Sequence, residues 1–163
     1  MMNYSTTYLC DLYAQSLHLQ IAESIFKSFG NAAFFSGQIT TLKVFEDDQL
    51  IKQVLNESVT QRILVIDGCG SHRCALIDAD LAQMAIHNGW QGLIIYGCVR
   101  QTLALNELNL GIRALHAHPL KPHKAGIGER DTTVTFAGIH FKTDHYLYAD
   151  ADGIIVSDQA LII

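Results

Sequence analysis

The 163-residue sequence lacks several features that mark common classes of protein. No apolar run approaches the ~20 residues of a membrane-spanning helix. The first residues carry neither a cationic segment nor the apolar segment of a secretory signal. The four cysteines show no paired metal-site spacing, since four residues separate Cys69 from Cys74. These absences predict a cytoplasmic protein with reduced thiols and no membrane partner.

Positive charge is also scarce, with 11 Lys and Arg against 16 Asp and Glu and a net charge of -5. Nucleic-acid binding without sequence preference needs a cationic surface, so no direct nucleic-acid partner is expected. The acidic balance favours an Arg- or Lys-rich protein partner instead. Hydrophobic residues make up 49% of the chain and charged residues 17%, which indicates extensive burial or a subunit interface. At this length we expect one domain, residues 1–163.

Residues 63–101 organise the predicted fold. An apolar run at 63–66 ends in a turn with two glycines at 68–71, which is typical of a buried strand. A helical pattern follows and should stop at residues 88–89, and a second apolar run covers 93–96. This order has the length of a right-handed parallel crossover. Both glycine turns therefore fall at the carboxyl ends of parallel strands, where open sheets place ligands.

The remaining segments predict a mixed α/β domain, with parallel crossovers first and an antiparallel meander last. Residues 118–130 hold both prolines and are the best candidate for a long functional loop. From residue 132 onwards the pattern is all strand, with a hairpin turn at 150–153. The other expected elements are two helical pieces within 5–28, a strand over 33–44, a helix over 46–55, a short helix over 102–108 and a strand over 111–116.

Two basic residues suggest an anion site at the ends of these strands. Backbone amides before a helix, together with Arg73, favour a carboxylate or phosphate, although a tight turn explains residues 68–73 equally well. The third glycine of a dinucleotide-binding loop is missing. Arg100 follows a strand end and is able to clamp a carboxylate, or it is a surface or subunit-interface arginine.

Three histidines, His116, His118 and His123, form an H-x-H-x4-H cluster that invites a metal interpretation. Their spacing matches no general zinc pattern, and a proline-containing loop divides the set. No metal site is expected there.

Several long motifs in fixed order carry a resemblance to a known family. They are YLCDLY, SGQITTLKVFEDD, IDGCGSHRCAL, LAQMAIHNGWQGLIIYGCVRQ, LNLGIRAL, GIGERD, VTFAGIHF and DHYLYADADGIIVS. Over almost its whole length the chain resembles the family of the regulator of ribonuclease E activity A (RraA). The resemblance implies a three-layer β/β/α swivelling-type domain and a ring-shaped homotrimer that sometimes pairs further. It also implies an inhibitor of RNA cleavage that binds ribonuclease E, partly at its C-terminal scaffold region, and associates with the DEAD-box helicase of the degradosome.

The wider superfamily includes metal-dependent 4-hydroxy-4-methyl-2-oxoglutarate aldolases that also decarboxylate oxaloacetate. The resemblance places Gly-Asp-x-Leu-Ala and Val-Arg-Asp motifs in those enzymes, with both aspartates serving the cation. This sequence has Ala79 and Gln101 at the two positions. Because Mg²⁺ and Mn²⁺ prefer anionic oxygen ligands, we expect a non-enzymatic protein with no metal and no cofactor. A metal-dependent aldolase or oxaloacetate decarboxylase is the alternative.

A vestigial anion pocket is expected even without catalysis, because Arg100 and the glycine loop persist. In the related aldolases the arginine and the loop amides are implied to hold the keto acid. The residues expected to form the pocket are Gly68, Gly70, Ser71, Arg73, Asp78, Ala79, Asp80, Leu81, Arg100 and Gln101.

Overall fold

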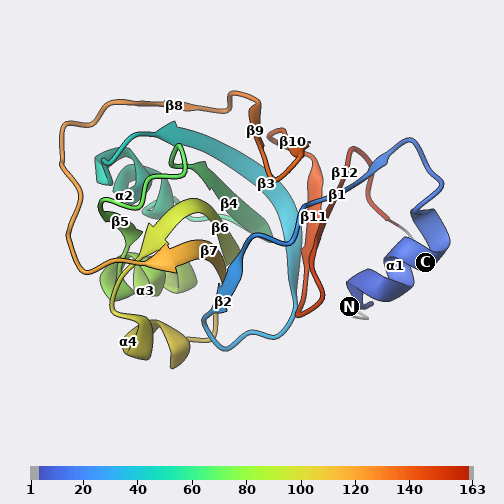
Figure 1. Ribbon diagram of the computed structural model, residues 1–163, viewed down its shortest axis with the longest axis horizontal. Helices are drawn as coiled ribbons and strands as arrows, with labels where there is room; N and C mark the ends of the chain where they lie inside the picture. The colour runs from blue at the N-terminus through green and yellow to red at the C-terminus, as the bar shows by residue number, and fades with distance from the viewer. Residues whose placement is uncertain (1–3, 162–163) are drawn as a thin grey trace.

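The computed structural model describes residues 4–161, so residues 1–3 and 162–163 of the expected domain lie outside the described part. A ten-stranded sheet forms the body of the molecule (Figure 1). In sheet order its strands are β1 (Leu19–Ile21), β12 (Ile154–Ser157), β11 (Tyr146–Ala149), β3 (Phe35–Val44), β4 (Arg62–Asp67), β6 (Trp90–Val99), β7 (Gly111–Ala117) and β2 (Lys27–Phe29), with β5 (Ala75–Ile77) beside β6 and β8 (Gly128–Arg130) beside β3. A separate hairpin consists of β9 (Val134–Phe136) and β10 (Ile139–Phe141).

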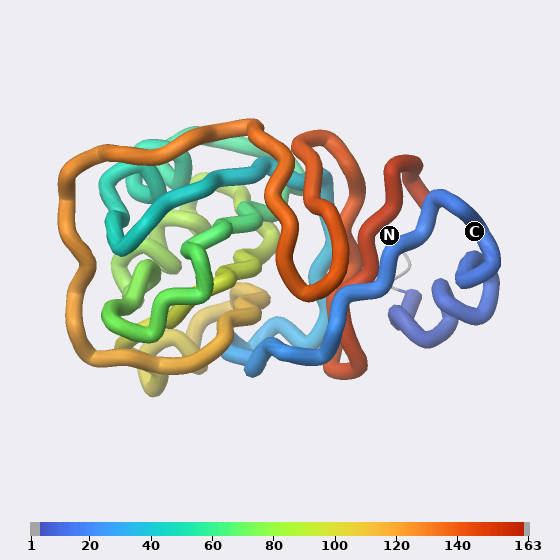
Figure 2. Tube along the Cα trace, turned by 45° about the horizontal axis from the view of Figure 1, so that its top comes forward, coloured from blue at the N-terminus to red at the C-terminus, as the bar shows by residue number. Residues whose placement is uncertain are grey.

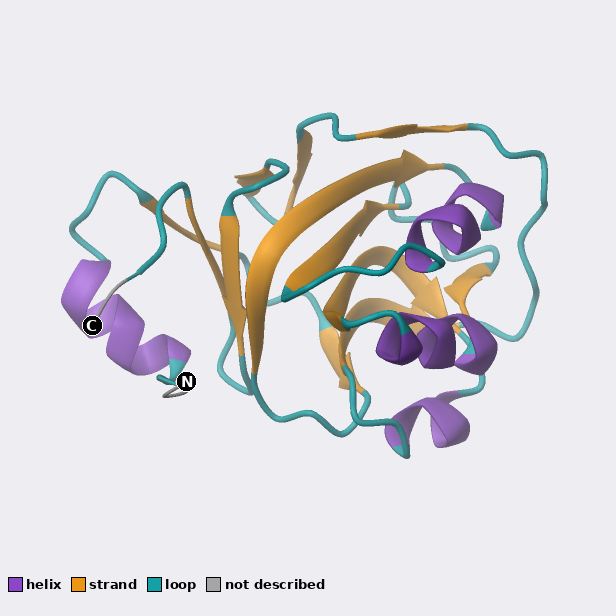
Figure 3. Ribbon diagram, turned by 180° about the vertical axis from the view of Figure 1, so that it is seen from behind, coloured by secondary structure: helices purple, strands orange, loops and turns teal. Residues whose placement is uncertain are grey.

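The helices lie against one face of this sheet, apart from α1 (Thr6–Tyr13), which lies at one end of the molecule (Figure 1). Figure 3 shows α2 (Gln49–Leu55), α3 (Ala79–His87) and α4 (Thr102–Asn106) in front of the strands. Alternating side chains of β4 divide the core, because neighbours in a strand point to opposite faces. Leu64 and Ile66 pack with the helices, whereas Ile63 and Val65 pack with the β9–β10 hairpin. The three layers confirm the expected mixed α/β, β/β/α fold.

The parallel part of the sheet also agrees with the prediction made from the sequence. Strands β3, β4, β6 and β7 are parallel neighbours, and the predicted crossover is β4–α3–β6. Asp78 caps α3 by accepting the N–H of Leu81, and the helix ends at His87, before Asn88 and a left-handed Gly89. Four strands therefore bring their carboxyl ends to one edge.

The prediction of two helical pieces within residues 5–28 is wrong for the second piece. The first is α1, capped by Ser5 as expected. The second segment instead forms the edge strands β1 and β2, and Ile21 and Ile25 remain exposed. Backbone bonds from Ala22 to Ile154 and from Glu23 to Ala137 hold this segment extended. Tertiary hydrogen bonding here overrides the helix-like spacing of apolar residues.

Other boundaries differ in smaller ways. The helix expected from residue 46 begins at Gln49, because Glu46 has a left-handed backbone with φ 53°. Strand β5 has only three residues, too few to show a periodic pattern. The C-terminal strands form two hairpins in different sheets, and the turn at 150–153 joins β11 to β12 as predicted.

The segment from His118 to Ile127 follows an outer path around the carboxyl edge of the sheet, drawn in orange in Figure 2. The buried carboxylate of Asp47 fastens it. Its Oδ2 accepts the N–H groups of Ala125 (2.9 Å), Gly126 (2.8 Å) and Ile127 (3.3 Å). Backbone bonds from His123 to Glu46 (2.8 Å) and from Ala75 to Leu120 (2.9 Å) hold the earlier part of the same segment.

A close approach fixes the opposite end of the parallel strands. The ring of Phe35 lies against Gly92 of β6 and Gly111 of β7. An added Cβ would lie 2.2 Å from this ring at Gly92 and 1.9 Å from it at Gly111. Only glycine fits beside the ring at these two positions.

Within residues 4–161 we find no helix with the length and apolar character that a bilayer crossing requires.

Candidate functional site

A pocket of about 400 Å³ opens where β6 and β7 end and α4 begins. Neighbouring parallel strands place their following residues side by side, which is where α/β sheets bind ligands. The pocket is lined by Arg100, Gln101, Thr102, Ala117, His118 and Pro119.

Arg100 supplies the positive charge of this pocket. Its backbone N–H donates to Ile77 (2.9 Å), which holds the residue against β5. Its side-chain Nε and Nη1 are buried and have no hydrogen-bond partner among the described residues. Two buried N–H donors without an acceptor are unfavourable, so an anionic ligand is a suitable partner for this side chain.

Gln101 lies beside it in a left-handed conformation, with φ 58° and ψ 47°. Its backbone oxygen accepts the N–H of Leu105 and so begins α4. Its side-chain Oε1 accepts the N–H of Ala79 at 3.0 Å. Because that partner is a donor, the amide oxygen must face Ala79, and the Nε2 group is left as a donor.

His118 completes the polar lining. Its backbone N–H donates to Val99 (2.9 Å), and its Nδ1 accepts the N–H of Leu120 (3.1 Å). An accepting Nδ1 places the proton of the neutral ring on Nε2. Sequence reasoning treated His118 only as part of a metal cluster. Its position just after a parallel strand next to the Arg100 strand was the signal that could have identified it.

Several backbone N–H groups of the predicted glycine loop are bonded to other protein atoms rather than open to a ligand. The N–H groups of Gly68 and Gly70 both donate to Tyr96 (3.0 and 3.1 Å), and that of Ser71 to Gly68 (3.3 Å). The N–H of Cys69 donates to the Asp67 carboxylate (2.9 Å). The alternative interpretation of this loop as a tight turn describes its geometry.

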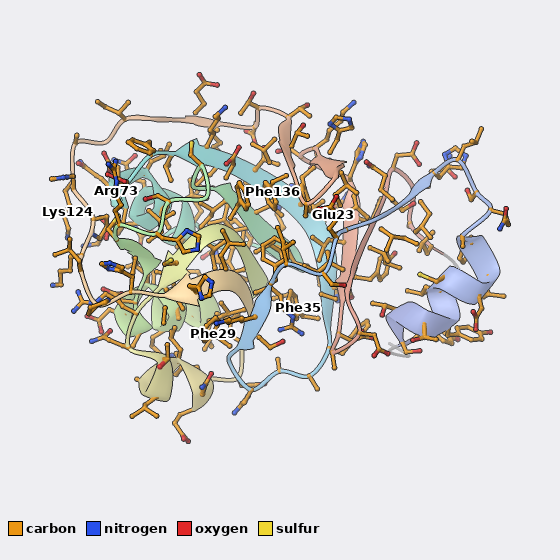
Figure 4. The ribbon with its side chains drawn as sticks, in the orientation of Figure 1. Glu23, Phe29, Phe35, Arg73, Lys124 and Phe136 are labelled. Atoms are coloured by element: carbon orange, nitrogen blue, oxygen red, sulfur yellow. The ribbon has the colours of Figure 1, made fainter. Side chains whose placement is uncertain are left out.

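Arg73 forms an ion pair with Glu46 and does not line the pocket that contains Arg100. Its Nε donates to Glu46 at 2.6 Å, and the Ser71 hydroxyl donates to the same carboxylate at 2.8 Å. The hydrogen bonds from Arg73 and then Ser71 lower the pKa of Glu46. Figure 4 shows Arg73 and Lys124 at the end of the molecule away from α1.

The other predicted pocket residues belong to the start of α3. Asp78 is occupied as the helix cap, Leu81 lies in the core and Asp80 is exposed. Of the ten predicted residues, the structure brings Ala79, Arg100 and Gln101 together by direct contact or adjacency.

The donor set does not fit the divalent cation that the resemblance implies. Both positions expected to carry carboxylates are neutral, and the amide oxygen of Gln101 is taken by Ala79. Within residues 4–161 no three His, Cys, Asp or Glu side chains are grouped as a metal site. In the histidine cluster, His116 Nδ1 lies 3.0 Å from Lys27 Nζ, and His118 Nδ1 faces Leu120.

Thiol chemistry has no support near the pocket. Burial raises the pKa of the Cys98 thiol and, with Glu46 and Cys98 nearby, that of Cys74. Both thiols therefore remain protonated and unreactive at neutral pH.

The chain is similar to several known proteins over almost its whole length. A family model described as "RraA-like: Aldolase/RraA" matches residues 6–156. A protein of Methylococcus capsulatus, named "Putative 4-hydroxy-4-methyl-2-oxoglutarate aldolase", is 55% identical over 99% of this chain and 100% of its own length. A protein of the same name from Alkalilimnicola ehrlichii is 47% identical, with 99% of both chains covered.

A solved structure described as the RNA-processing inhibitor RraA from Thermus thermophilis is also similar. It has a TM-score of 0.93 and 38% identity, and the match covers 99% of this chain and 96% of that one.

These relatives overturn the expectation of a non-enzymatic ribonuclease E inhibitor. Full-length relatives at 44–55% identity carry the name of an aldolase, which points to an enzyme. The prediction that the chain is not an enzyme is therefore wrong, and the aldolase alternative is better supported. The error was to infer loss of the whole reaction from Ala79 and Gln101, although Arg100 is retained and lines the pocket.

Proposed function

The chain belongs to the Aldolase/RraA family, and from that premise we propose that it is a carbon–carbon lyase acting on 4-hydroxy-4-methyl-2-oxoglutarate. The observation that carries the proposal is that Arg100 lines a pocket at the carboxyl edge of the sheet, and that its Nε and Nη1 atoms have no acceptor among the described residues. The names of the full-length relatives supply the substrate.

The substrate fits the charge of the pocket. It is a dicarboxylate with an oxo group next to one carboxylate, so it presents adjacent anionic and polar oxygens. A guanidinium binds such a pair in a planar, two-point geometry. In the same pocket the amide Nε2 of Gln101 and the Nε2–H of His118 are further donors.

The proposed reaction is a retro-aldol cleavage. The C4 hydroxyl loses its proton to solvent water, the bond between C3 and C4 breaks, and the electron pair moves to C3 as the enolate of pyruvate, which later takes a proton from solvent. Protonation of C3 then gives two molecules of pyruvate. Negative charge grows on the C2 oxygen in this step, and fixed donors aimed at that oxygen lower the barrier. Arg100 is placed to be the principal donor.

Oxaloacetate tests the same chemistry with a different leaving group. Loss of CO₂ from oxaloacetate produces the same pyruvate enolate, so the same donors stabilise it. We propose that the pocket also supports this decarboxylation.

The direct test is pyruvate release, followed by the oxidation of NADH with lactate dehydrogenase. For Arg100→Lys we expect an approximately 100-fold loss of kcat/KM, which corresponds to ~2.7 kcal/mol, because the ammonium cannot reproduce the two-point contact. Arg73→Lys is the matched control, because Arg73 is paired with Glu46 outside the pocket; we expect at most about a twofold change. Equal losses in both variants would contradict the assignment of Arg100. No pyruvate from the wild-type protein would refute the proposed function.

We also propose that the working form is a homo-oligomer, with the trimer as the expected state. Leu103, next to the pocket on α4, is 86% exposed, and Leu17 is 100% exposed. Isolated exposed leucines do not by themselves mark an interface, so the proposal rests on membership of the Aldolase/RraA family. Light scattering during gel filtration measures the mass, and a monomer of 18.0 kDa would contradict the proposal. A cytoplasmic location, which suits four free thiols, is likewise a proposal.

A further inference from the structure

We infer that this chain binds its oxo-acid without a divalent cation, and that the side chain of Gln101 acts as an anion-binding donor in the place of a metal-binding carboxylate. The inference rests on the proposed function for the class of substrate. It concerns what Gln101 and Ala79 do in this chain.

The first argument is the hydrogen bond between the two positions. The N–H of Ala79 donates to Gln101 Oε1 at 3.0 Å, so the oxygen that a cation would need is already an acceptor. A cation there would have to share this neutral oxygen with the N–H of Ala79, and the amide would contribute no negative charge to hold it. The left-handed backbone of Gln101 holds the side chain toward the start of α3.

The second argument is the direction of the remaining donors. With Oε1 facing Ala79, the two N–H bonds of Gln101 Nε2 are the polar groups that this side chain presents elsewhere. Arg100 contributes buried Nε and Nη1 atoms without partners in the described chain. Arg100 and the Nε2 group of Gln101 therefore both offer donors, and neither residue carries a negative charge, which suits an anion and opposes a cation.

The third argument is the position of the nearest carboxylates. Asp78 accepts the N–H of Leu81 at 2.9 Å and is occupied as the cap of α3. Asp80 is exposed on the first turn of the same helix. Glu46 is bound by Arg73 and Ser71. None of these three carboxylates offsets the charge of Arg100.

The chemistry remains balanced without a cation. The charge that develops on the C2 oxygen during cleavage is met by the N–H groups of Arg100 and Gln101, and the proton lost from the C4 hydroxyl is matched by the proton gained at C3. No oxidant, reductant or further reactant is required.

The experiment combines turnover with a binding measurement. Pyruvate release is compared in excess EDTA and in excess Mg²⁺. Binding of oxalate, a stable mimic of the enolate, is measured by calorimetry with and without Mn²⁺, and Mn²⁺ binding alone by electron paramagnetic resonance. We expect turnover and oxalate affinity to change less than about twofold with metal, because Gln101 and Arg100 supply only donors.

Two variants separate the roles of the side chain. Gln101→Glu keeps the shape but replaces the donor group by an acceptor, so metal-free oxalate affinity should fall at least about tenfold. Ala79→Asp/Gln101→Asp supplies the two missing carboxylates, and should gain Mn²⁺ binding and a metal-dependent affinity for oxalate. Thermal melting of each variant checks that it is folded.

The outcomes distinguish this inference from the proposed function. Wild-type turnover that is lost in EDTA and restored by Mg²⁺ would overturn the inference and keep the aldolase. Absence of turnover under both conditions would refute the aldolase, while metal-independent oxalate binding would still support the donor site. Oxalate binding that requires Mn²⁺ in the wild type would overturn the inference in either case.

Discussion

Replacing Asp47 tests how the segment from His118 to Ile127, called here the outer loop, is held at the carboxyl edge of the sheet. The carboxylate is buried, with 3% exposure, and accepts three loop N–H groups through Oδ2 and the N–H of Gln49 through Oδ1. In Asp47→Asn one oxygen becomes an NH₂ group, which faces an N–H whichever way the amide turns. Hydrogen bonds to a charged acceptor contribute ~1.5–3 kcal/mol each, but the exposed loop amides regain water when released.

We therefore expect Asp47→Asn to lower the free energy of unfolding by about 2–3 kcal/mol. At roughly 2–4 °C per kcal/mol for a domain of this size, the melting temperature should fall by about 5–10 °C. Circular dichroism measures the melting temperature. Hydrogen exchange at Ala125, Gly126 and Ile127 should accelerate more than exchange elsewhere, because these amides lose their acceptor.

The effect should depend on pH with a defined sign. Burial raises the pKa of the Asp47 carboxyl, but hydrogen bonds from Gln49, Ile127, Ala125 and Gly126 outweigh it and leave the pKa below its ordinary value. The carboxylate therefore stabilises the fold fully above the unfolded pKa of about 3.9, and this contribution is lost as the pH falls through the lower folded-state pKa. The difference between wild type and Asp47→Asn should shrink below about pH 4.

Asp48 provides a control one residue away. Burial raises the pKa of its carboxyl, with Asp78 and Asp47 adding to burial and Lys124 opposing it. The folded protein therefore favours the charged form less than the unfolded chain does, and Asp48→Asn should leave the melting temperature at neutral pH unchanged or raise it. An unchanged melting temperature in Asp47→Asn, or equal losses in the two variants, would refute the reasoning.

Two further predictions concern packing and the N-terminal helix. Gly111→Ala would place a Cβ 1.9 Å from the Phe35 ring, so it should lower the free energy of unfolding, measured in urea, by about 3 kcal/mol. Gly153→Ala is the control: an added Cβ there has nothing within 4 Å, so the free energy of unfolding should change by less than about 0.5 kcal/mol. Similar values for both would show that the close approach is unimportant. Asp150 accepts the N–H and hydroxyl of Thr6 at 2.7 and 2.6 Å, so Asp150→Asn should release α1. Hydrogen exchange in α1 should then show an opening free energy lower by about 1–2 kcal/mol, and unchanged exchange would contradict this anchoring role.

The parallel part of the fold was accessible from sequence because it is made of long, buried runs. In β4 and β6 the apolar residues are continuous, and Asn88-Gly89 marks the end of α3 clearly. The short edge strands were not accessible. Strands β1 and β2 depend on partners more than 80 residues away, such as Ser157 for Leu19 and Ala114 for Lys27, and local spacing carries no trace of these pairings.

The site was partly predictable because two of its residues follow one of these long, buried strands. Arg100 and Gln101 follow a recognisable strand, so their place at the carboxyl edge could be inferred. Whether backbone amides are free to bind an anion depends on the loop conformation, and the bonds from Gly68 and Gly70 to Tyr96 appear only in three dimensions. The orientation of the Gln101 amide likewise depends on its contact with Ala79, which lies 22 positions away.

The ring of Phe35 between Gly92 and Gly111 has a consequence for how this sequence is able to change. Strands β6 and β7, which lead to Arg100 and His118 at one end, pack Gly92 and Gly111 against this ring at the other. Neither glycine accepts a side chain while the ring is present, and a smaller residue at position 35 would leave a void in the core. A viable route must therefore shrink position 35 first and fill the space afterwards, through an intermediate that is less stable than either end. Phe35, Gly92 and Gly111 therefore constrain one another, and a change at one of these positions requires changes at the others.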